Sequence, residues 1–262
     1  MSVLPTFTTL GKGHTVLMLH GIGGGRSIWS DASSGTALAV AGLGCRAVAV
    51  DLPGYGDSIG AGEPTLAHMV STVVDLLDHL APRRVALLGH SMGGILYGLM
   101  PPHPAIDRVV TLGSGSGYTQ HLAKPLRYSM GFFWNVMVPV SVRMNGYFAG
   151  RRLRAVGDLP RGVVGQWRRW CKHPDFIVSE GDHVREAYAR VKTPITVVMV
   201  ADDGLASREG VRAVHSHYTQ ADLRWVTLKP RELGVKAIGH FHFFHPKAGP
   251  RVWSVSLPWL GA

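Results

Sequence analysis

Short runs of apolar residues alternate along the chain with longer segments in which apolar residues recur every three or four positions. The clearest helical segment is 66–80, where the apolar side chains share one stripe and Pro64 and Pro82 mark its ends. The apolar runs are short enough to be buried strands and lie at 15–19, 46–50, 84–88, 108–112, 195–200 and 223–227. Further helices are expected near 31–43 and at 250–260. The alternation predicts an α/β fold with a mostly parallel, doubly wound sheet of about eight strands.

The segment 115–190 interrupts this alternation. It is rich in Arg, Trp and Phe and contains helical fragments without a convincing strand. It lies between the predicted strands 108–112 and 195–200, whose carboxyl ends share one edge of the sheet. We therefore expect a core formed by 1–114 and 191–262, and a helical lid formed by 115–190 that folds over this edge.

Charge is unevenly distributed along the 262 residues. The net charge is +10, and segment 115–190 holds 12 Lys and Arg against 5 Asp and Glu, a net of +7. No helix-turn-helix, zinc-binding or RNA-binding signature accompanies the basic residues, so nucleic-acid binding is not expected. They form a solvated face, or alternatively attract an acidic substrate or partner.

The composition favours a folded cytoplasmic protein. Hydrophobic residues make up 46% of the chain, the start lacks a signal-peptide pattern, and the longest apolar run, 132–142, is interrupted by Asn135 and Pro139. Cys45 and Cys171 are too few for a disulfide framework and lack zinc-site spacing, which indicates reduced core thiols. The oligomeric state is left open by the sequence.

One strand leads directly into Gly89-His90-Ser91-Met92-Gly93. A serine on a sharp turn between a strand and a helix is held in a strained backbone conformation, so the residues two before and two after it must be nearly without side chains. Gly89 and Gly93 meet this requirement, and an apolar helical pattern follows up to Pro101. We interpret Ser91 as a nucleophile; the alternative is a glycine-rich turn that contains a serine.

A serine hydroxyl needs a base, and the base needs a carboxylate that fixes its tautomer. The strand at 195–200 is followed by Asp202 and Asp203, and a later loop contains His240. We favour Asp203 as the acid because of its position after the strand, and Asp202 remains an alternative. His240 is the predicted base, since His242 and His245 are less favourably placed; a metal site formed by these three is disfavoured because no carboxylate is close in sequence. We expect neither a metal nor a cofactor.

The oxyanion of a tetrahedral intermediate needs N–H donors, and a glycine-rich loop, 20–25, follows the strand at 15–19. We assign the donors as the backbone N–H groups of Met92 and Ile22. The Gly23 N–H is the alternative to that of Ile22. The alternative of a dinucleotide-binding loop is disfavoured because the third glycine is replaced by Arg26. We expect His90 to be a packing residue and His20 to support the loop.

With Ser91, Asp203, His240 and the His20-Gly21 loop in this order, the chain resembles the α/β-hydrolase superfamily over nearly its whole length. His20-Gly21 with Trp29, and the loop 51–58, are similar to the branch of carboxylesterases, C–C bond hydrolases and serine haloperoxidases. The lid, at 146–171, and the C-terminal half are instead similar to a family of predicted α/β-hydrolases. Asp51 and Asp57 are interpreted as structural turn residues.

The resemblance implies an enzyme of the carboxylesterase type that cleaves a small-molecule ester through an acyl-enzyme, with substrate selected by the basic, aromatic lid. C–C bond, lactone or thioester hydrolysis, acyl transfer and perhydrolysis use the same three groups and remain alternatives, as does a non-catalytic receptor or scaffold. Ser91 excludes the dehalogenase and epoxide hydrolase mechanisms of the superfamily, which need a carboxylate nucleophile. An anionic substrate is compatible with the basic lid. Candidate substrate contacts are Trp29, Phe133, Trp134, Tyr147, Trp167 and Phe241.

Overall fold

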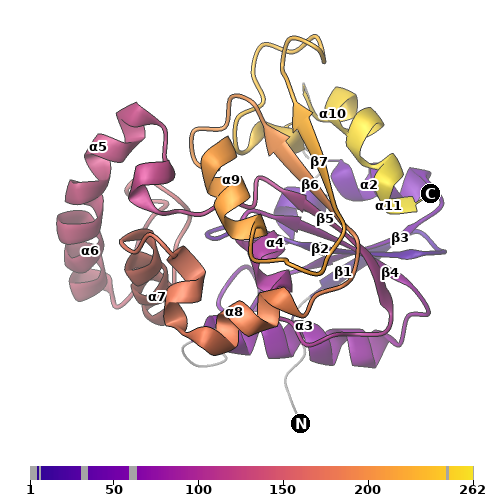
Figure 1. The fold of residues 1–262 in the computed structure, drawn as a ribbon, viewed down its shortest axis with the longest axis horizontal. Coiled ribbons are helices and arrows are strands. Elements are labelled where there is room, and N and C mark those ends of the chain that lie inside the picture. The colour runs from indigo at the N-terminus through magenta and orange to yellow at the C-terminus, as the bar shows by residue number, and fades with distance from the viewer. Residues whose placement is uncertain (1–4, 6, 31–34, 59–63, 246–247, 262) are drawn as a thin grey trace.

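The computed structural model describes residues 5, 7–30, 35–58, 64–245 and 248–261 and contains a seven-stranded sheet (Figure 1). Its spatial order is β1-β3-β2-β4-β5-β6-β7, and all neighbours are parallel except the β1–β3 pair. The strands are β1 (Phe7–Leu10), β2 (Thr15–Leu19), β3 (Arg46–Val50), β4 (Val85–His90), β5 (Ile106–Leu112), β6 (Ile195–Val200) and β7 (Leu223–Leu228). The predicted mostly parallel sheet is confirmed, with seven strands in the described residues where about eight were expected. The sequence pattern missed β1, an edge strand whose last three residues are exposed.

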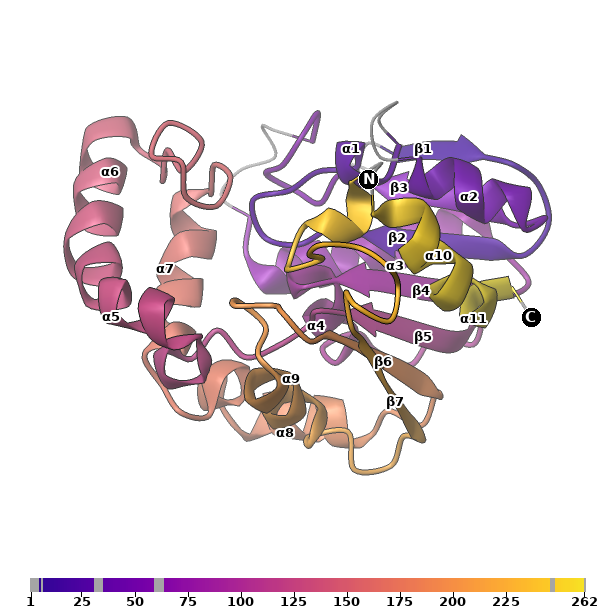
Figure 2. The ribbon, with the colours of Figure 1, turned by 90° about the horizontal axis from the view of Figure 1, so that it is seen from above.

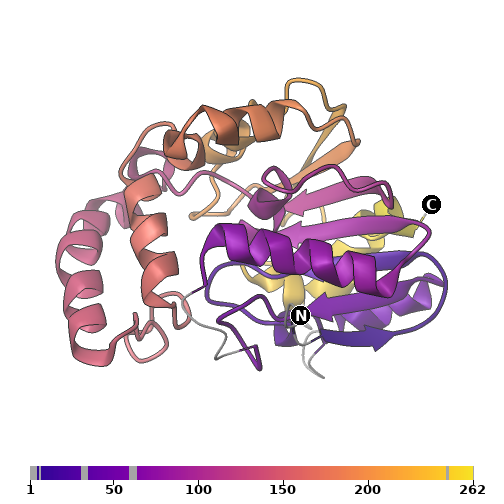
Figure 3. The same ribbon diagram turned by 90° about the horizontal axis from the view of Figure 1, so that it is seen from below.

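Helices cover both faces of the sheet. Successive residues of a buried strand point to opposite faces, so Val16 and Met18 of β2 pack into one apolar cluster and Leu17 and Leu19 into another. The first cluster lies beneath α2 and α10, and the second beneath α3, α4 and α9; Figure 3 shows α3 lying across its face. The helices outside 115–190 are α1 (Ser27–Ser30), α2 (Thr36–Gly42), α3 (Leu66–Leu80), α4 (Met92–Tyr97), α9 (Arg208–His215), α10 (Gly249–Ser256) and α11 (Pro258–Gly261), with a 3-10 turn at His242–Phe244.

Local signals fixed the ends of α3. It begins at Leu66 after Thr65, whose side chain accepts the His68 N–H, and it ends before Ala81 in a left-handed conformation. Two other expectations differ from the structure. Within the range 31–43 the structure contains the shorter helix α2, with 31–34 outside the described residues and α1 ending before this range. The helix expected at 250–260 is divided into α10 and α11 because Pro258 cannot continue the first helix.

Segment 115–190 contains the remaining helices of the described residues. These are α5 (Lys124–Phe132), a π-helical turn (Phe133–Met137), α6 (Val138–Asn145), α7 (Arg161–Cys171) and α8 (Asp182–Ala189), with 3-10 turns at Thr119–His121 and Phe176–Glu180. Figure 2 shows α5, α6 and α7 as a group beyond the end of the sheet, with α8 apart from them. Tyr188 of α8 is buried and donates its hydroxyl to the Ile95 carbonyl at 2.7 Å. The helix α8 therefore packs on α4, and α5 to α7 form the part beyond the sheet.

Basic side chains in α7 and directly after it bind the π turn. In a π turn the backbone hydrogen bonds change register, and here the Trp134 carbonyl accepts from Arg168 Nε at 2.7 Å. Lys172 Nζ donates to Asn135 Oδ1 at 2.6 Å. These two cations thus help to pack α7 against the α5–α6 helix, the continuous helix formed by α5, the π turn and α6.

No helix among the described residues is long and apolar enough to cross a bilayer.

A buried histidine makes the stability of the fold depend on pH. His215 of α9 donates Nδ1–H to the Val211 carbonyl at 2.8 Å and accepts the Thr111 hydroxyl at Nε2, 2.9 Å away. Burial lowers the pKa of His215 to about 4, so the folded protein holds it neutral below pH 6.5 while the unfolded chain takes up a proton. Burial lowers the pKa of His20 to about 4 and that of His90 to about 3, with the same sign of effect.

We therefore expect the free energy of unfolding to fall as the pH decreases from 6.5 towards 4. Substituting His215→Gln should reduce this slope by about 1.4 kcal/mol per pH unit, the contribution of one proton. The measurement is urea unfolding at several pH values, and His183→Gln, at an exposed position, is the control. An unchanged slope in His215→Gln would contradict the prediction.

Candidate active site

Ser91 lies between β4 and α4 in a strained backbone conformation, with φ 51° and ψ −119°. The tight turn brings neighbouring backbone very close to the two glycines. A Cβ on Gly89 would lie 2.4 Å from the Gly94 Cα, and one on Gly93 would lie 2.2 Å from the Leu19 carbonyl oxygen. Both positions thus require glycine, which is the steric condition that the sequence pattern indicated.

Asp203 and His240 form a hydrogen-bonded pair. The His240 Nδ1–H donates to Asp203 Oδ2 at 2.7 Å, and Asp203 Oδ1 accepts the N–H groups of Leu205 and Ala206, each at 2.8 Å. Burial raises the pKa of the Asp203 carboxyl, but the His240 ring and the two N–H groups outweigh burial and hold this pKa below its usual value. The ionised carboxylate fixes the proton of His240 on Nδ1, which leaves Nε2 free to accept a proton.

Asp202 has a different set of partners. Its two carboxylate oxygens accept the N–H groups of Ile238 and Gly239, each at 3.0 Å. These residues directly precede His240, so Asp202 holds the loop that carries the histidine. The structure thus brings Asp203, and not Asp202, against the His240 ring.

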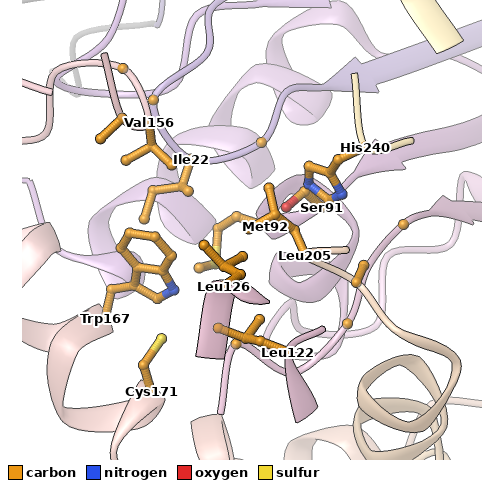
Figure 4. Close-up of a pocket in the computed structure, with 18 of the residues that line it drawn as sticks. Ile22, Ser91, Met92, Leu122, Leu126, Val156, Trp167, Cys171, Leu205 and His240 are labelled. Atoms are coloured by element: carbon orange, nitrogen blue, oxygen red, sulfur yellow. The ribbon is translucent and has the colours of Figure 1, made fainter. Parts of the chain in front are cut away.

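Ser91 and His240 line the same cavity, of about 610 Å³, and Figure 4 shows both side chains at one end of it. Its other end is lined by residues of segment 115–190. Those with apolar side chains are Leu122, Leu126, Met130, Phe132, Phe133, Trp134, Met137, Ala155, Val156, Trp167, Cys171 and Phe176. Among the described residues that line the cavity there is no Lys, Arg, Asp or Glu. The cavity therefore favours apolar groups over charged ones.

The predicted substrate contacts divide into two groups. Four line the cavity: Phe133, Trp134, Trp167 and Phe241. Trp29 and Tyr147 do not. Trp29 is fully buried with its ring against Phe244, at a centroid distance of 4.8 Å, and the large Tyr147 side chain is exposed. The residues that sequence reasoning missed, such as Leu122, Leu126 and Leu205, are aliphatic and carry no pattern that distinguishes a cavity wall from an ordinary core.

The remaining residues singled out around the serine stabilise loops. His90 donates Nε2–H to the His240 carbonyl at 3.0 Å, and burial keeps it neutral by lowering its pKa to about 3. His20 donates Nδ1–H to the Gly21 carbonyl at 2.7 Å and accepts the Leu52 N–H at 3.1 Å. The Asp51 carboxylate accepts the N–H groups of Arg26 and Asp57, as expected for a turn residue.

The two candidate oxyanion donors lie close to the serine. Ile22 directly follows Gly21. A Cβ added to Gly21 would lie only 2.9 Å from the Ser91 Cβ, so this loop packs closely against the serine. Met92 is the first residue of α4, where backbone N–H groups have no partner within the helix. Within the described part of the chain, neither N–H donates to another protein group. Both are therefore available to a ligand oxygen.

The histidines after His240 have local partners. His242 Nδ1–H donates to the Ile238 carbonyl at 3.0 Å, and the rings of His242 and His245 lie 5.6 Å apart. The described residues contain no group of three or more His, Cys, Asp or Glu side chains arranged to hold a metal ion.

Comparison with known proteins identifies the family. A model of the alpha/beta hydrolase family matches residues 16–249. The chain is 23% identical to epoxide hydrolase 2 of Siraitia grosvenorii over 97% of this chain and 72% of that one. It is 35% identical to a 2-hydroxy-6-oxononadienedioate/2-hydroxy-6-oxononatrienedioate hydrolase of Cupriavidus pinatubonensis over 39% of this chain and 37% of that one. The structure of the putative non-heme bromoperoxidase BpoC from Mycobacterium tuberculosis superposes with a TM-score of 0.65 at 17% identity, covering 99% and 97% of the two chains. The chain belongs to the alpha/beta hydrolase family, which confirms the resemblance drawn from its sequence.

Proposed function

We propose that the protein is a serine hydrolase that cleaves carboxylic esters of apolar acids through an acyl-enzyme. The observation that carries the proposal is the Asp203–His240 pair, hydrogen-bonded at 2.7 Å, in the cavity that contains the strained Ser91. Ser91 Oγ attacks the ester carbonyl carbon while His240 Nε2 takes the hydroxyl proton. The carbonyl oxygen becomes an oxyanion, which the N–H groups of Ile22 and Met92 stabilise.

Collapse of this intermediate breaks the bond to the alcohol. His240 gives its proton to the departing alkoxide, and the acyl group stays on Ser91. A water molecule then attacks the acyl carbonyl, again losing its proton to His240, and the acid leaves as Ser91 recovers the proton. Asp203 stays ionised throughout and stabilises the imidazolium that forms twice in the cycle.

The wall formed by α5 to α7 supports a neutral, apolar acyl group as substrate. We propose that these helices act as the lid, and that its aromatic rather than its basic side chains meet the substrate. A carboxylate would lose its hydration without compensation in this cavity, because the described residues of its wall include no Lys or Arg. The cavity thus disfavours an anionic substrate, including a dicarboxylate such as the one in the name of the Cupriavidus relative. Epoxide opening by a carboxylate nucleophile is also disfavoured, because a serine occupies position 91.

A fluorophosphonate probe and a series of p-nitrophenyl esters test the proposal. We expect the probe to label the native protein and peptide mapping to locate the label on Ser91. The value of kcat/KM should rise by about fourfold per added CH₂ in the acyl chain until the cavity is filled, because each buried CH₂ contributes about 0.8 kcal/mol. Heat-denatured protein is the control. Native protein that neither reacts with the probe nor hydrolyses any ester would refute the esterase proposal.

A further inference from the structure

Five large apolar side chains are exposed along the outer face of the α5–α6 helix. Tyr128, Phe132, Val136, Val140 and Met144 lie four residues apart and are 74%, 62%, 43%, 50% and 76% exposed. Residues at this spacing share one helix face, and the π turn at Phe133–Met137, which winds less per residue, reduces the drift of the row around the helix. We refer to these five residues as the outer stripe.

The outer stripe is uncovered, whereas the inner face of the same helix is not. Met130 and Trp134 are buried and line the cavity. Figure 2 shows α5 and α6 as the outermost layer on this side, with α7 between them and the core. Surface apolar residues are normally scattered singly, so a continuous row on one helix marks an interaction surface.

The surroundings of the outer stripe are strongly cationic. The segment 115–160 contains six basic residues, Lys124, Arg127, Arg143, Arg151, Arg152 and Arg154, against one acidic residue, Asp158. The turn that carries the last three arginines is fixed to α6, because the Ala149 N–H donates to Ser141 Oγ at 2.9 Å. The helix that carries the outer stripe and the turn that follows it therefore hold these basic residues, of which Arg143, Arg151, Arg152 and Arg154 are exposed.

We propose that this face docks on the surface of an anionic lipid bilayer, with the outer stripe entering the headgroup boundary and the basic residues contacting lipid headgroups. Exposed aromatic and aliphatic residues flanked by Lys and Arg characterise helices that lie in the plane of a membrane surface. Pairing of the face with a second copy of the chain is disfavoured, because a two-fold interface would bring the same arginine clusters together. Phe132 belongs to the outer stripe and also lines the cavity, so docking would bring the cavity to the lipid.

Vesicle sedimentation tests the proposal independently of any esterase activity. We expect the full chain to bind vesicles of phosphatidylcholine mixed with phosphatidylglycerol, and to bind phosphatidylcholine alone much more weakly. The variant Tyr128→Ser/Val140→Ser/Met144→Ser removes three members of the outer stripe that do not line the cavity, and Arg143→Gln/Arg152→Gln/Arg154→Gln removes three charges. Each basic residue near an anionic surface contributes about 1 kcal/mol, so the charge variant should bind about 100-fold more weakly.

The matched control is Leu38→Ser, which removes an exposed aliphatic side chain from α2 and should bind as the original protein does. Unchanged circular dichroism and unchanged melting temperature establish that the variants fold. Equal binding of the original protein and both triple variants, or no binding to anionic vesicles at all, would overturn the proposal. Light scattering that shows a dimer for the original chain and a monomer for the Tyr128 triple variant would also overturn it, in favour of self-association.

Discussion

Replacing Ser91 by alanine is expected to lower kcat for p-nitrophenyl ester hydrolysis by about 10⁶-fold, the size of loss seen when the nucleophile of a serine hydrolase is removed. Alanine keeps the Cβ and so imposes the same demand on the turn at φ 51°. The substitution deletes only the hydroxyl, and the variant should fold as the original protein does. The measurement is kcat in the spectrophotometric assay, together with the intact mass after exposure to a fluorophosphonate.

A second serine of the cavity provides the control for this prediction. Ser129 also lines the cavity, but its hydroxyl donates to the Leu126 carbonyl of its own helix at 2.8 Å. Ser129→Ala should therefore still take up one fluorophosphonate label, whereas Ser91→Ala should take up none. Labelling of Ser91→Ala at the original rate would mean that another side chain is the nucleophile.

The parts of the site that are predictable are those marked by a short sequence motif or by the order of the strands. Gly89 is required by contacts within the turn, with Gly94, and Gly93 by the end of β2 at Leu19, but both belong to one five-residue pattern that is visible in the sequence. The order of Ser91, Asp203 and His240 along the chain follows from the order of the strands that precede them. Both inferences can be drawn from the pattern alone, although the contact of Gly93 with Leu19 is a long-range one.

The choice between Asp202 and Asp203 could not be made as securely from the sequence, because adjacent residues have the same chemistry. Their roles differ through contacts 36 and 37 residues away: the Asp202 carboxylate accepts backbone N–H groups at Ile238 and Gly239, and Asp203 accepts the His240 ring. Such contacts depend on how the loop folds back over the sheet edge. Sequence spacing alone does not specify that path.

Segment 115–190 is the least predictable region, for two physical reasons. An aromatic residue in a small helical unit has the same pattern whether it packs internally, lines a cavity or is exposed, and Trp134, Trp170 and Tyr147 differ in this respect. From the sequence alone, the positive charge of the segment indicates a solvated face or an attraction for an acidic substrate or partner. Most of these cations are exposed, the described residues of the cavity wall include none of them, and Arg168 holds the π turn.

Asparagine substitutions separate the roles of the two aspartates. Asp203→Asn is expected to lower kcat by about 10⁴-fold, as the corresponding change does in Ser-His-Asp enzymes. The amide removes the negative charge that stabilises the imidazolium, and its NH₂ group favours the histidine tautomer in which Nδ1 accepts and Nε2 is protonated, so that Nε2 no longer takes the Ser91 proton. The variant should retain the fold, because the amide oxygen can still accept the N–H groups of Leu205 and Ala206.

Asp202→Asn is the matched control, because it makes the same chemical change one residue away. Asp202 is exposed and its two oxygens accept the Ile238 and Gly239 N–H groups, so the amide loses one acceptor and loosens the loop before His240. We expect a lower melting temperature and a loss in kcat of about tenfold, because a slightly misplaced base still carries the correct tautomer. Both values come from one ester assay and one thermal melt of each variant. A larger loss of kcat in Asp202→Asn than in Asp203→Asn would show that Asp202 is the partner of the base during turnover, and that the loop rearranges from the geometry of the free protein.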